Sequence, residues 1–332
     1  MRLVKLPSIG SVALLMMLCK TGLAAEPAGF IDGLKLGGYS SVQLTVPKDG
    51  KTEAAINEVS LILSWEGDSR FKFLTEFEAN KPLSWNDEKK FNNRENSFDL
   101  ERIYLDYNFS EKINLRAGRF LTPTGRWNLL HAAPLEWTTT RPIVTNRLFP
   151  NYTNGIMAFG AVPIGTSAFE YSVFVEAIED EIDNDNDVKF ENVKGARFTF
   201  GQDFNIGLNL ASFSEKTVNN PSYRLAGLDF LTHYQSLEFS GEAFKRWDSH
   251  DKNGGSGAYL QTAIPLPGLL NWYGLARFET FQRPDENHSE RWLLGTTWRI
   301  KPTQALKLEF TGGSGDQPES PRGFLASFAV LF

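Results

Sequence analysis

The sequence is almost without cysteine. Cys19 is the only one among 332 residues, and it lies in an amino-terminal segment that we expect to be removed. A mature chain without a thiol forms neither disulfides nor cysteine-ligated metal sites. The four histidines are dispersed, without metal-ligand spacing: His131, His233, His250 and His288. We therefore expect no cofactor.

The sequence also lacks long apolar runs. No stretch reaches the roughly 18 consecutive apolar residues that a membrane-spanning helix needs. An apolar stretch at 9–18 follows Arg2 and Lys5 and precedes small residues up to Ala25, which is the layout of a secretory signal peptide. We predict a signal peptide at residues 1–24, with cleavage after Ala25 as the alternative, and one barrel domain at 25–332.

Positive charge is in deficit as well. The formal net charge is −6, and removal of residues 1–24 takes away three basic residues and no acidic one. An acidic chain argues against nucleic acid as a partner. Exported chains of this composition are periplasmic, secreted or outer-membrane proteins, and composition does not choose among them.

What the chain does have is alternation of apolar with polar or small residues, in segments of about ten residues. In 290–300, for example, Trp292, Leu294 and Trp298 alternate with Arg291 and Arg299. Such a strand has two different faces, as in a membrane barrel or a water-soluble sandwich. We predict sixteen strands, at 34–46, 56–66, 70–79, 98–109, 112–120, 154–163, 168–178, 193–201, 205–214, 223–233, 236–247, 257–265, 269–282, 290–300, 304–312 and 323–332.

The connections between these strands alternate strictly between short and long. The short ones are rich in turn-forming residues, and the long ones lie at 47–55, 80–97, 121–153, 179–192, 215–222, 248–256, 283–289 and 313–322. Short periplasmic turns and long external loops are typical of outer-membrane barrels. The last strand places Phe324, Phe328 and terminal Phe332 on one apolar face, which resembles the carboxy-terminal signature recognised by the barrel-assembly machinery. The fold class we predict is an all-β, sixteen-stranded antiparallel transmembrane barrel with its long third external loop folded into the lumen. We expect it in the outer membrane of a Gram-negative bacterium.

The longest loop, 121–153, is the predicted constriction, because sixteen strands leave a lumen too wide for side chains to fill. It combines Arg126, Arg141, Arg147 and His131 with a single Glu136. Arginines at a constriction favour anions. The alternative is that they pair with carboxylates of the wall and only fasten the loop.

Charges on the predicted inner face of the strands are mixed, which favours salt bridges along the wall over a single binding site. Of these, Arg102 and Arg116 lie on neighbouring strands beside the long loop and are the next candidates for the solute pathway. The whole set is Arg102, Arg116, Arg197, Arg277, Arg291, Arg299, Lys72 and Lys307, with Asp106, Glu76, Glu78, Glu170, Glu176, Glu238, Glu242, Glu279 and Glu309.

An acidic loop at 179–191 carries Asp183, Asp185 and Asp187 in alternation, which could hold a divalent cation through oxygen ligands. The glycine and the distant glutamate of a calcium loop are missing. We therefore favour a solvated acidic rim that is bridged to lipopolysaccharide through divalent ions.

The stretch Gly118-Arg119-Phe120-Leu121-Thr122-Pro123-Thr124-Gly125-Arg126-Trp127-Asn128 resembles the phosphate-selective porin O/P group and related porins. The stretch from Arg141 to Gly155 resembles the return leg of the third loop in similar proteins, so the match covers roughly residues 100–165. The resemblance implies a sixteen-stranded porin. The phosphate-specific members depend on an eyelet rich in lysine and arginine, whereas no Lys occurs here between Ile113 and Asn186.

The function predicted from the sequence is passive diffusion of small hydrophilic solutes, with a preference for anions such as phosphate or organic anions. Its expected partners are those solutes, outer-membrane lipid and lipopolysaccharide, the assembly machinery and two further copies of the chain in a homotrimer. Two alternatives stay open. One is a barrel that forms part of a larger assembly, and the other is an enzyme at the rim, with His250 beside Ser249 or Ser256.

Overall fold

The computed structural model describes residues 33–66, 70–87, 97–130, 132–179, 188–217, 219–284, 288–315 and 322–332. Residues Leu34–Phe332 belong to one compact unit. The predicted signal peptide at 1–24 lies outside the described residues. No helix within the described ranges has both the length and the apolar character needed to cross a membrane.

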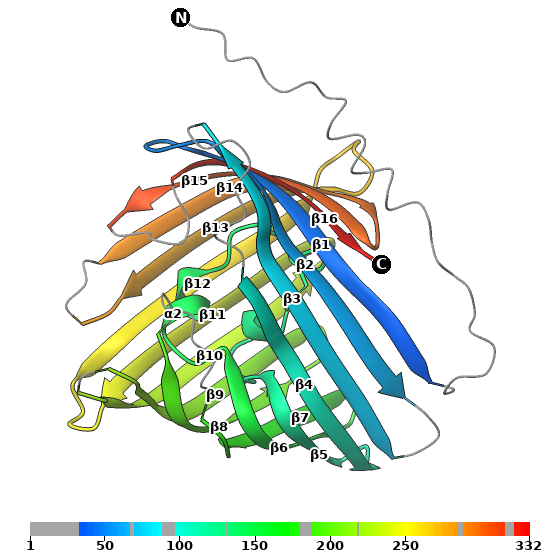
Figure 1. Ribbon diagram of the computed structural model, residues 1–332, viewed down its shortest axis with the longest axis vertical. Helices are drawn as coiled ribbons and strands as arrows, with labels where there is room; N and C mark the ends of the chain where they lie inside the picture. Colours follow the sequence, from blue (N-terminus) through cyan, green and yellow to red (C-terminus); the bar gives the residue numbers. More distant parts are fainter. Residues whose placement is uncertain are drawn as a thin grey trace, which may run out of the picture. The chain divides into compact units, whose positions relative to one another are not determined.

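Sixteen antiparallel strands form one closed barrel in sequence order, and β1 pairs with β16 (Figure 1). This confirms the predicted fold class and strand number. The strands are β1 (Leu34–Pro47), β2 (Glu53–Glu66), β3 (Phe71–Asn86), β4 (Ser97–Ser110), β5 (Ile113–Leu121), β6 (Tyr152–Ile164), β7 (Ser167–Glu176), β8 (Phe190–Phe200), β9 (Phe204–Glu215), β10 (Ser222–Tyr234), β11 (Leu237–Asp248), β12 (Asn253–Pro265), β13 (Trp272–Gln282), β14 (Ser289–Lys301), β15 (Gln304–Ser314) and β16 (Gly323–Leu331). Two short helices, η2 (Trp127–Leu129) and α2 (Ile143–Arg147), lie between β5 and β6.

The seam between the first and last strands closes the sheet. Tyr39 of β1 lies opposite Leu331 of β16. Beyond β16, the N–H of Phe332 donates to the carbonyl of Gly38 at 2.9 Å, and the N–H of Gly38 donates to the carbonyl of Phe332 at 2.9 Å. Because every strand has two neighbours, the sheet has no open edge, as a β-structure surrounded by lipid requires.

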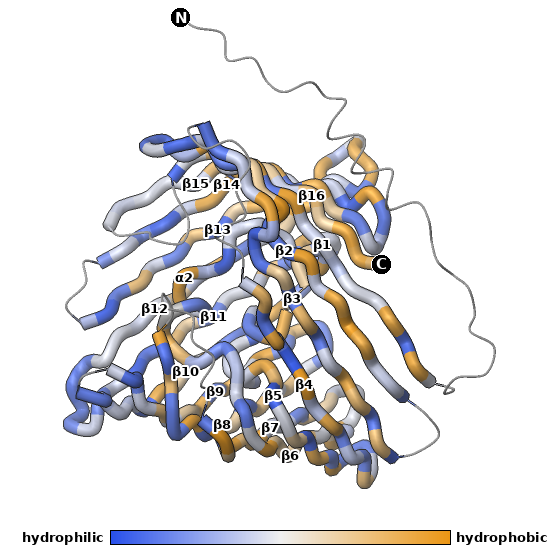
Figure 2. Tube along the Cα trace, viewed as in Figure 1, coloured by the Kyte–Doolittle hydropathy of each residue, from blue (hydrophilic) through white to orange (hydrophobic). Residues whose placement is uncertain are grey.

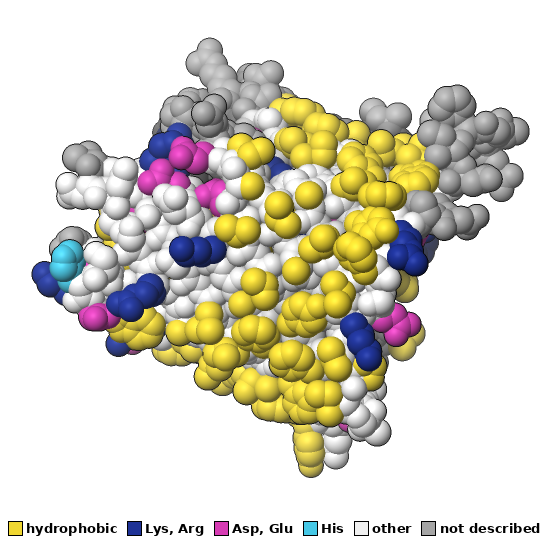
Figure 3. Space-filling model, turned by 90° about the horizontal axis from the view of Figure 1, so that it is seen from below, with side chains coloured by type: hydrophobic (Ala, Val, Ile, Leu, Met, Phe, Trp, Pro, Cys, Tyr) yellow, Lys and Arg dark blue, Asp and Glu magenta, His cyan; other side chains and the backbone are white. Residues whose placement is uncertain are grey.

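The alternation along each strand separates an inner face from an outer one. On β14, Leu293 is fully buried, whereas the adjacent Leu294 is 58% exposed. The colours in Figure 2 alternate in the same way along many strands. Figure 3 shows hydrophobic side chains over a broad area of the outer surface with few charged groups among them. An apolar outer face around a polar interior is the inverse of a water-soluble barrel.

Five strand boundaries differ from the predicted ones by three residues or more. Two of them are the start of β2 at Glu53 rather than at 56 and the start of β8 at Phe190 rather than at 193. β3 continues to Asn86 rather than ending at 79, and β12 begins at Asn253 rather than at 257. β13 begins at Trp272 rather than at 269, because residues 266–271 form the preceding turn. The differences in β3, β12 and β13 lie where Gly, Pro or Asn interrupts the alternation, and such residues are typical of turns.

Candidate functional site

The segment between β5 and β6, residues 122–151, is called the inner loop here, because its backbone bonds to inward-facing side chains of the barrel wall. It enters through Gly125, whose φ of +75° is in the left-handed region that favours glycine. The N–H of Gly125 donates to Oδ1 of Asn209 on β9 at 2.8 Å. A Cβ at this position would lie 2.4 Å from Oε2 of Glu242, so the turn has no room for a side chain.

Acidic side chains of the wall accept hydrogen bonds from the backbone of the inner loop. Oε1 of Glu242 on β11 accepts the N–H of Arg126 at 2.9 Å and the N–H of Trp127 at 2.6 Å. Glu279 and Glu309 act in the same way on β13 and β15. Their bonds are Ile143 N–H to Glu279 Oε2 at 2.8 Å and Thr140 N–H to Glu309 Oε2 at 3.2 Å. Hydrogen bonds to an ionised acceptor are about twice as strong as neutral ones.

Basic side chains of the wall donate to the carbonyl groups of the same loop. The donors come from β13, β14 and β15, so the loop is bound on the far side of the barrel from its own strands. These bonds are Arg277 to Thr140 at 2.8 Å, Arg299 to Pro134 at 2.8 Å and Lys307 to Ala133 at 2.7 Å. Arg291 also donates to the carbonyl of Arg141. The charged side chains of the wall therefore bind the backbone of the inner loop directly.

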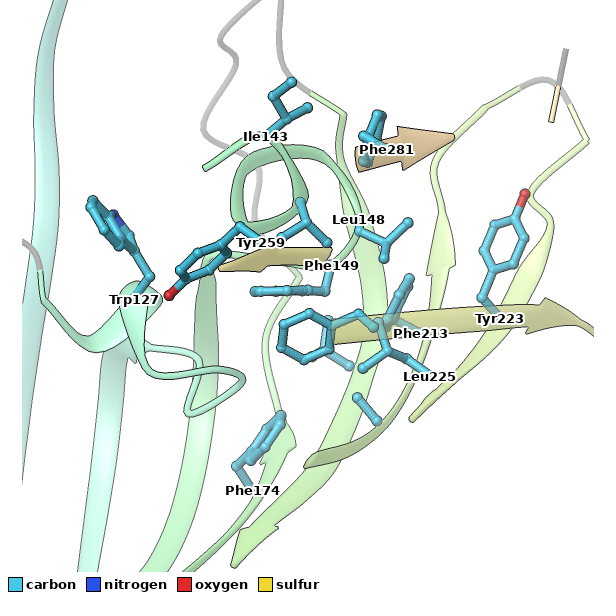
Figure 4. Close-up of a cluster of buried hydrophobic side chains, with 14 of the residues drawn as sticks. Trp127, Ile143, Leu148, Phe149, Phe174, Phe213, Tyr223, Leu225, Tyr259 and Phe281 are labelled. Atoms are coloured by element: carbon cyan, nitrogen blue, oxygen red, sulfur yellow. The ribbon is translucent and has the colours of Figure 1, made fainter. Parts of the chain in front are cut away.

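The second half of the inner loop is held by apolar packing. Leu148 and Phe149 follow α2 and are fully buried against inward-facing residues of the wall. Figure 4 shows them in a cluster with Phe213 and Leu225, which lie on β9 and β10. The Phe149 ring centroid lies 4.9 Å from that of Phe244 on β11. This cluster fixes the end of the loop that returns to β6.

Two groups of charged side chains under the loop are almost completely buried and contain both signs of charge. Glu279 lies between Arg277 at 2.9 Å and Arg291 at 2.7 Å. Arg246 pairs with Glu215 at 2.6 Å and also donates to a loop carbonyl, that of Leu148, at 3.1 Å. Buried ions are tolerated only when paired and hydrogen-bonded, as these are.

Two of the predicted loop arginines keep a charge that no carboxylate offsets through a direct bond. Among the described residues, no hydrogen bond or ion pair engages the Arg126 guanidinium, which lines a cavity beside the loop. The Arg141 guanidinium donates to Oδ1 of Asn128 at 2.6 Å and to the hydroxyl of Thr145 at 3.2 Å. Both acceptors are neutral.

The two predicted wall arginines are paired. Arg102 forms an ion pair with Glu76. Arg116 donates to both oxygens of Asp106, at 2.7 Å and 2.8 Å, and its guanidinium lies 3.7 Å from the centre of the Tyr104 ring. These pairs match the interpretation of wall charges as salt bridges.

The remaining predicted residues are placed only in part. Glu136 lines the same cavity as Arg126. His131 and the side chain of Arg147 lie outside the described part of the structure, as do Asp183, Asp185 and Asp187. Within the described ranges, no group of three or more His, Cys, Asp or Glu is arranged to hold a metal ion.

Sequence reasoning missed Arg246, Glu215 and Asp229 as inward-facing charges. Arg246 has the parity of Glu238 and Glu242 on the same strand, so continuing the alternation along β11 would have found it. Asp229 binds Arg197 at 2.6 Å and also accepts from Asn209, the residue that holds the entrance of the inner loop. Asn209 is an uncharged wall residue, and charge counting does not detect it.

Comparison with known proteins finds little similarity in sequence and clear similarity in structure. No family model matches the chain. An uncharacterised protein of Aquifex aeolicus is 31% identical over 132 residues. That match covers 39% of this chain and 29% of the Aquifex protein.

Solved structures with this fold are outer-membrane proteins. An anion-selective porin from Comamonas acidovorans has a TM-score of 0.58 at 12% identity, over 90% of this chain and 98% of that one. OmpF of Salmonella typhi, in complex with daunomycin, has a TM-score of 0.64 at 8% identity, over 90% and 97%. The trimer form of OmpT of Vibrio cholerae has a TM-score of 0.61 at 8% identity, over 90% and 99%. The chain therefore has the sixteen-stranded fold of the porins.

Proposed function

We propose that this protein is an outer-membrane channel through which small hydrophilic solutes diffuse passively. The observation that carries the proposal is the inner loop, which bonds to β9, β11, β13, β14 and β15 inside a closed barrel. A loop bound in this way narrows the lumen by a fixed amount. A narrowed, water-filled barrel sorts solutes by size and charge without moving parts.

The proposal includes a preference for anions. Among the described residues, the guanidinium groups of Arg126 and Arg141 bond to no carboxylate, whereas Arg102 and Arg116 are neutralised by Glu76 and Asp106. The uncompensated charge therefore lies on the inner loop. The structural likeness to an anion-selective porin is in accord with this preference.

Planar-bilayer recording tests the proposal. The wild-type protein should give ohmic conductance, with a reversal potential that favours anions across a salt gradient. Replacing Arg126 and Arg141 by Glu should move the reversal potential toward the cation side, because two positive charges on the loop become negative. The matched control is Arg224→Glu, in an exposed pair with Asp251 outside the lumen, which should leave the reversal potential unchanged. Protein that never opens channels would refute the proposal.

The two alternatives are less well supported. A barrel that encloses another component of an assembly needs a free lumen, and the inner loop occupies part of it. A rim enzyme would rest on Ser249 and His250, whose Oγ and Nδ1 lie 3.3 Å apart in the exposed loop after β11. Asp248 accepts the backbone N–H of His250 at 2.8 Å rather than a ring N–H, so this contact does not orient the imidazole as a triad would.

We further propose that residues 1–24 direct export, that the strand ending at Phe332 is recognised during assembly, and that the protein forms a homotrimer. The trimer form of a structurally similar outer-membrane protein supports the last point. Mass measurement of the purified protein in detergent would test both the cleavage site and the number of chains.

A further inference from the structure

A cavity of about 270 Å³ lies between the inner loop and the barrel wall. Its wall residues include Leu231, Glu238 and Arg299. Leu231 lies near the end of β10, Glu238 near the start of β11 and Arg299 near the end of β14. These strand ends lead into short turns. The cavity is therefore on the short-turn side of the loop, which solutes reach after passing the constriction in the inward direction.

Three aromatic side chains, those of Trp127, Trp137 and Tyr259, belong to the cavity lining. Trp127 and Tyr259 pack edge to face, with ring centroids 6.1 Å apart and an angle of 88° between the rings. Trp137 is held by a hydrogen bond from its Nε1 to Glu238 at 2.7 Å, and the Arg299 guanidinium lies 4.4 Å from its ring centre. Because these rings are held by their own contacts, a flat apolar ligand would meet surfaces that need little reorganisation.

The charged groups of the cavity differ in how far they are already engaged. Glu238 accepts from Trp137 and lies 3.2 Å from His233, while Arg299 donates to the carbonyls of Pro134 and Leu135. Glu136 also takes part in an interaction of its own. Within the described residues, Arg126 is the lining cation whose guanidinium has neither a hydrogen bond nor an ion pair.

The backbone of Arg126 is nevertheless fixed on both sides. Its N–H donates to Glu242 at 2.9 Å, and its carbonyl accepts the N–H of Leu129 at 3.2 Å. A planar guanidinium on a fixed backbone, with its donors unused, is suited to a carboxylate, which it can bind through two parallel hydrogen bonds. The cavity therefore combines one available cation with rigid aromatic walls.

We propose that this cavity binds a small aromatic carboxylate, with the carboxylate on Arg126 and the ring against Trp127 and Tyr259. Its volume of about 270 Å³ exceeds the roughly 150 Å³ of an engineered cavity that binds benzene, so it has room for a ligand with one ring. The inference rests on the proposed channel function and names a solute class for it. A solute of this class would be retained briefly at the cavity before it enters the periplasm.

Equilibrium binding to the purified protein in detergent micelles tests the inference, with three probes. Benzoate has both charge and ring, benzamide has the ring without the charge, and acetate has the charge without the ring. Benzoate should bind at least about tenfold more tightly than either of the others. Arg126→Gln should weaken benzoate binding by about tenfold or more, as expected when a charged hydrogen-bond partner is lost. The control Arg224→Gln, in the exposed pair with Asp251, should bind benzoate like the wild type.

Unchanged benzoate binding in Arg126→Gln would overturn the inference, and so would equal binding of acetate and benzoate. Arg126→Lys provides a second variant that keeps the charge, and it should recover part of the affinity. Bilayer recording separates the two proposals. Conductance without a preference for benzoate would overturn the aromatic site and leave the channel standing, whereas absence of conductance would overturn the channel itself.

Discussion

At Glu242, one carboxylate oxygen accepts the N–H groups of Arg126 and Trp127 and the hydroxyl of Tyr259. The side chain is almost fully buried, so no water can replace it as an acceptor for these groups. A single residue of the wall thus satisfies the start of η2, whose first N–H groups have no partner within the helix. Together with Asn209, which accepts the N–H of Gly125, this carboxylate holds the entrance of the inner loop.

Glu242→Ala should therefore lower the free energy of unfolding by about 1–3 kcal/mol for each donor that loses its acceptor. It should also make the open-channel current noisier, because the loop entrance is released. Glu242→Gln keeps an acceptor oxygen, so its free energy of unfolding should fall by less than that of Glu242→Ala. Denaturant unfolding in detergent and single-channel recording measure the two effects. Asp251→Ala, in an exposed pair, is the control, and an equal loss there would contradict the role of Glu242.

At the residue scale, the sequence predicted many of the charged wall positions, with Arg246, Glu215 and Asp229 missed, but not what the charges bind. Glu242, Glu279, Arg277 and Lys307 were all expected on the inner face as members of wall salt bridges. Most of their loop partners are backbone N–H and C=O groups. Every residue has such groups whatever its side chain, so no residue pattern marks them as partners.

At the scale of elements, the inner loop is a packed structure despite having only two short helices. Leu148 and Phe149 have no exposed surface, and they lie against residues of β9, β10 and β11. A helix as short as α2, from Ile143 to Arg147, is not stable on its own. Its position depends on this apolar contact and on the bond from Ile143 to Glu279.

Phe149→Ala should detach the returning half of the inner loop, since truncating a buried Phe costs about 3–5 kcal/mol. Trypsin should then cut within the loop, which contains Arg126, Arg141 and Arg147, while the barrel stays folded. Gel analysis of the fragments measures the cleavage. Leu129→Ala removes a loop side chain that is 41% exposed and should leave the loop resistant. Equal cleavage of both variants would show that the packing of Phe149 does not hold the loop.

The strand predictions were right in number because alternation and loop length are repeated over the whole chain. They were short where local chemistry resembles a turn. β3 continues through Lys81, with a φ of +41°, and Pro82. β12 starts at Asn253, which Gly254 and Gly255 follow. The Gly255 φ is +129°, and a Cβ on Gly254 would lie 2.6 Å from the Tyr223 ring. Glycine here leaves room for a neighbouring side chain that packs against the strand. A sequence pattern does not distinguish such a glycine from one in a turn.

At the scale of the whole molecule, the barrel depends on a seam between the two ends of the described chain. Gly38 lies at this seam, with its backbone paired to Phe332. A Cβ on Gly38 would lie 2.2 Å from the carbonyl oxygen of Ser60 and 3.0 Å from the Phe332 ring. The seam therefore has no space for a side chain at this position.

Gly38→Val should weaken the pairing of β1 with β16 that closes the barrel. When samples are heated to increasing temperatures before electrophoresis, the variant should change from the folded to the unfolded band at a lower temperature than the wild type. A pronounced loss is expected because the nearest atom is backbone, which has little freedom to move. Leu44→Val, on the same strand with a partly exposed side chain, is the matched control. If both variants melt alike, the close packing at Gly38 does not limit closure.

The binding of the inner loop through its own amide and carbonyl groups has a consequence for how this pore could change. At residues 133–135 the wall binds only carbonyl groups, so replacing these side chains leaves the bonds in place. Trp137 and Thr138 differ, because their side chains also bond to the wall. Diversification can therefore act on 133–135 while the scaffold stays constant. A library of substitutions restricted to these three positions would yield pores of altered permeability that still assemble.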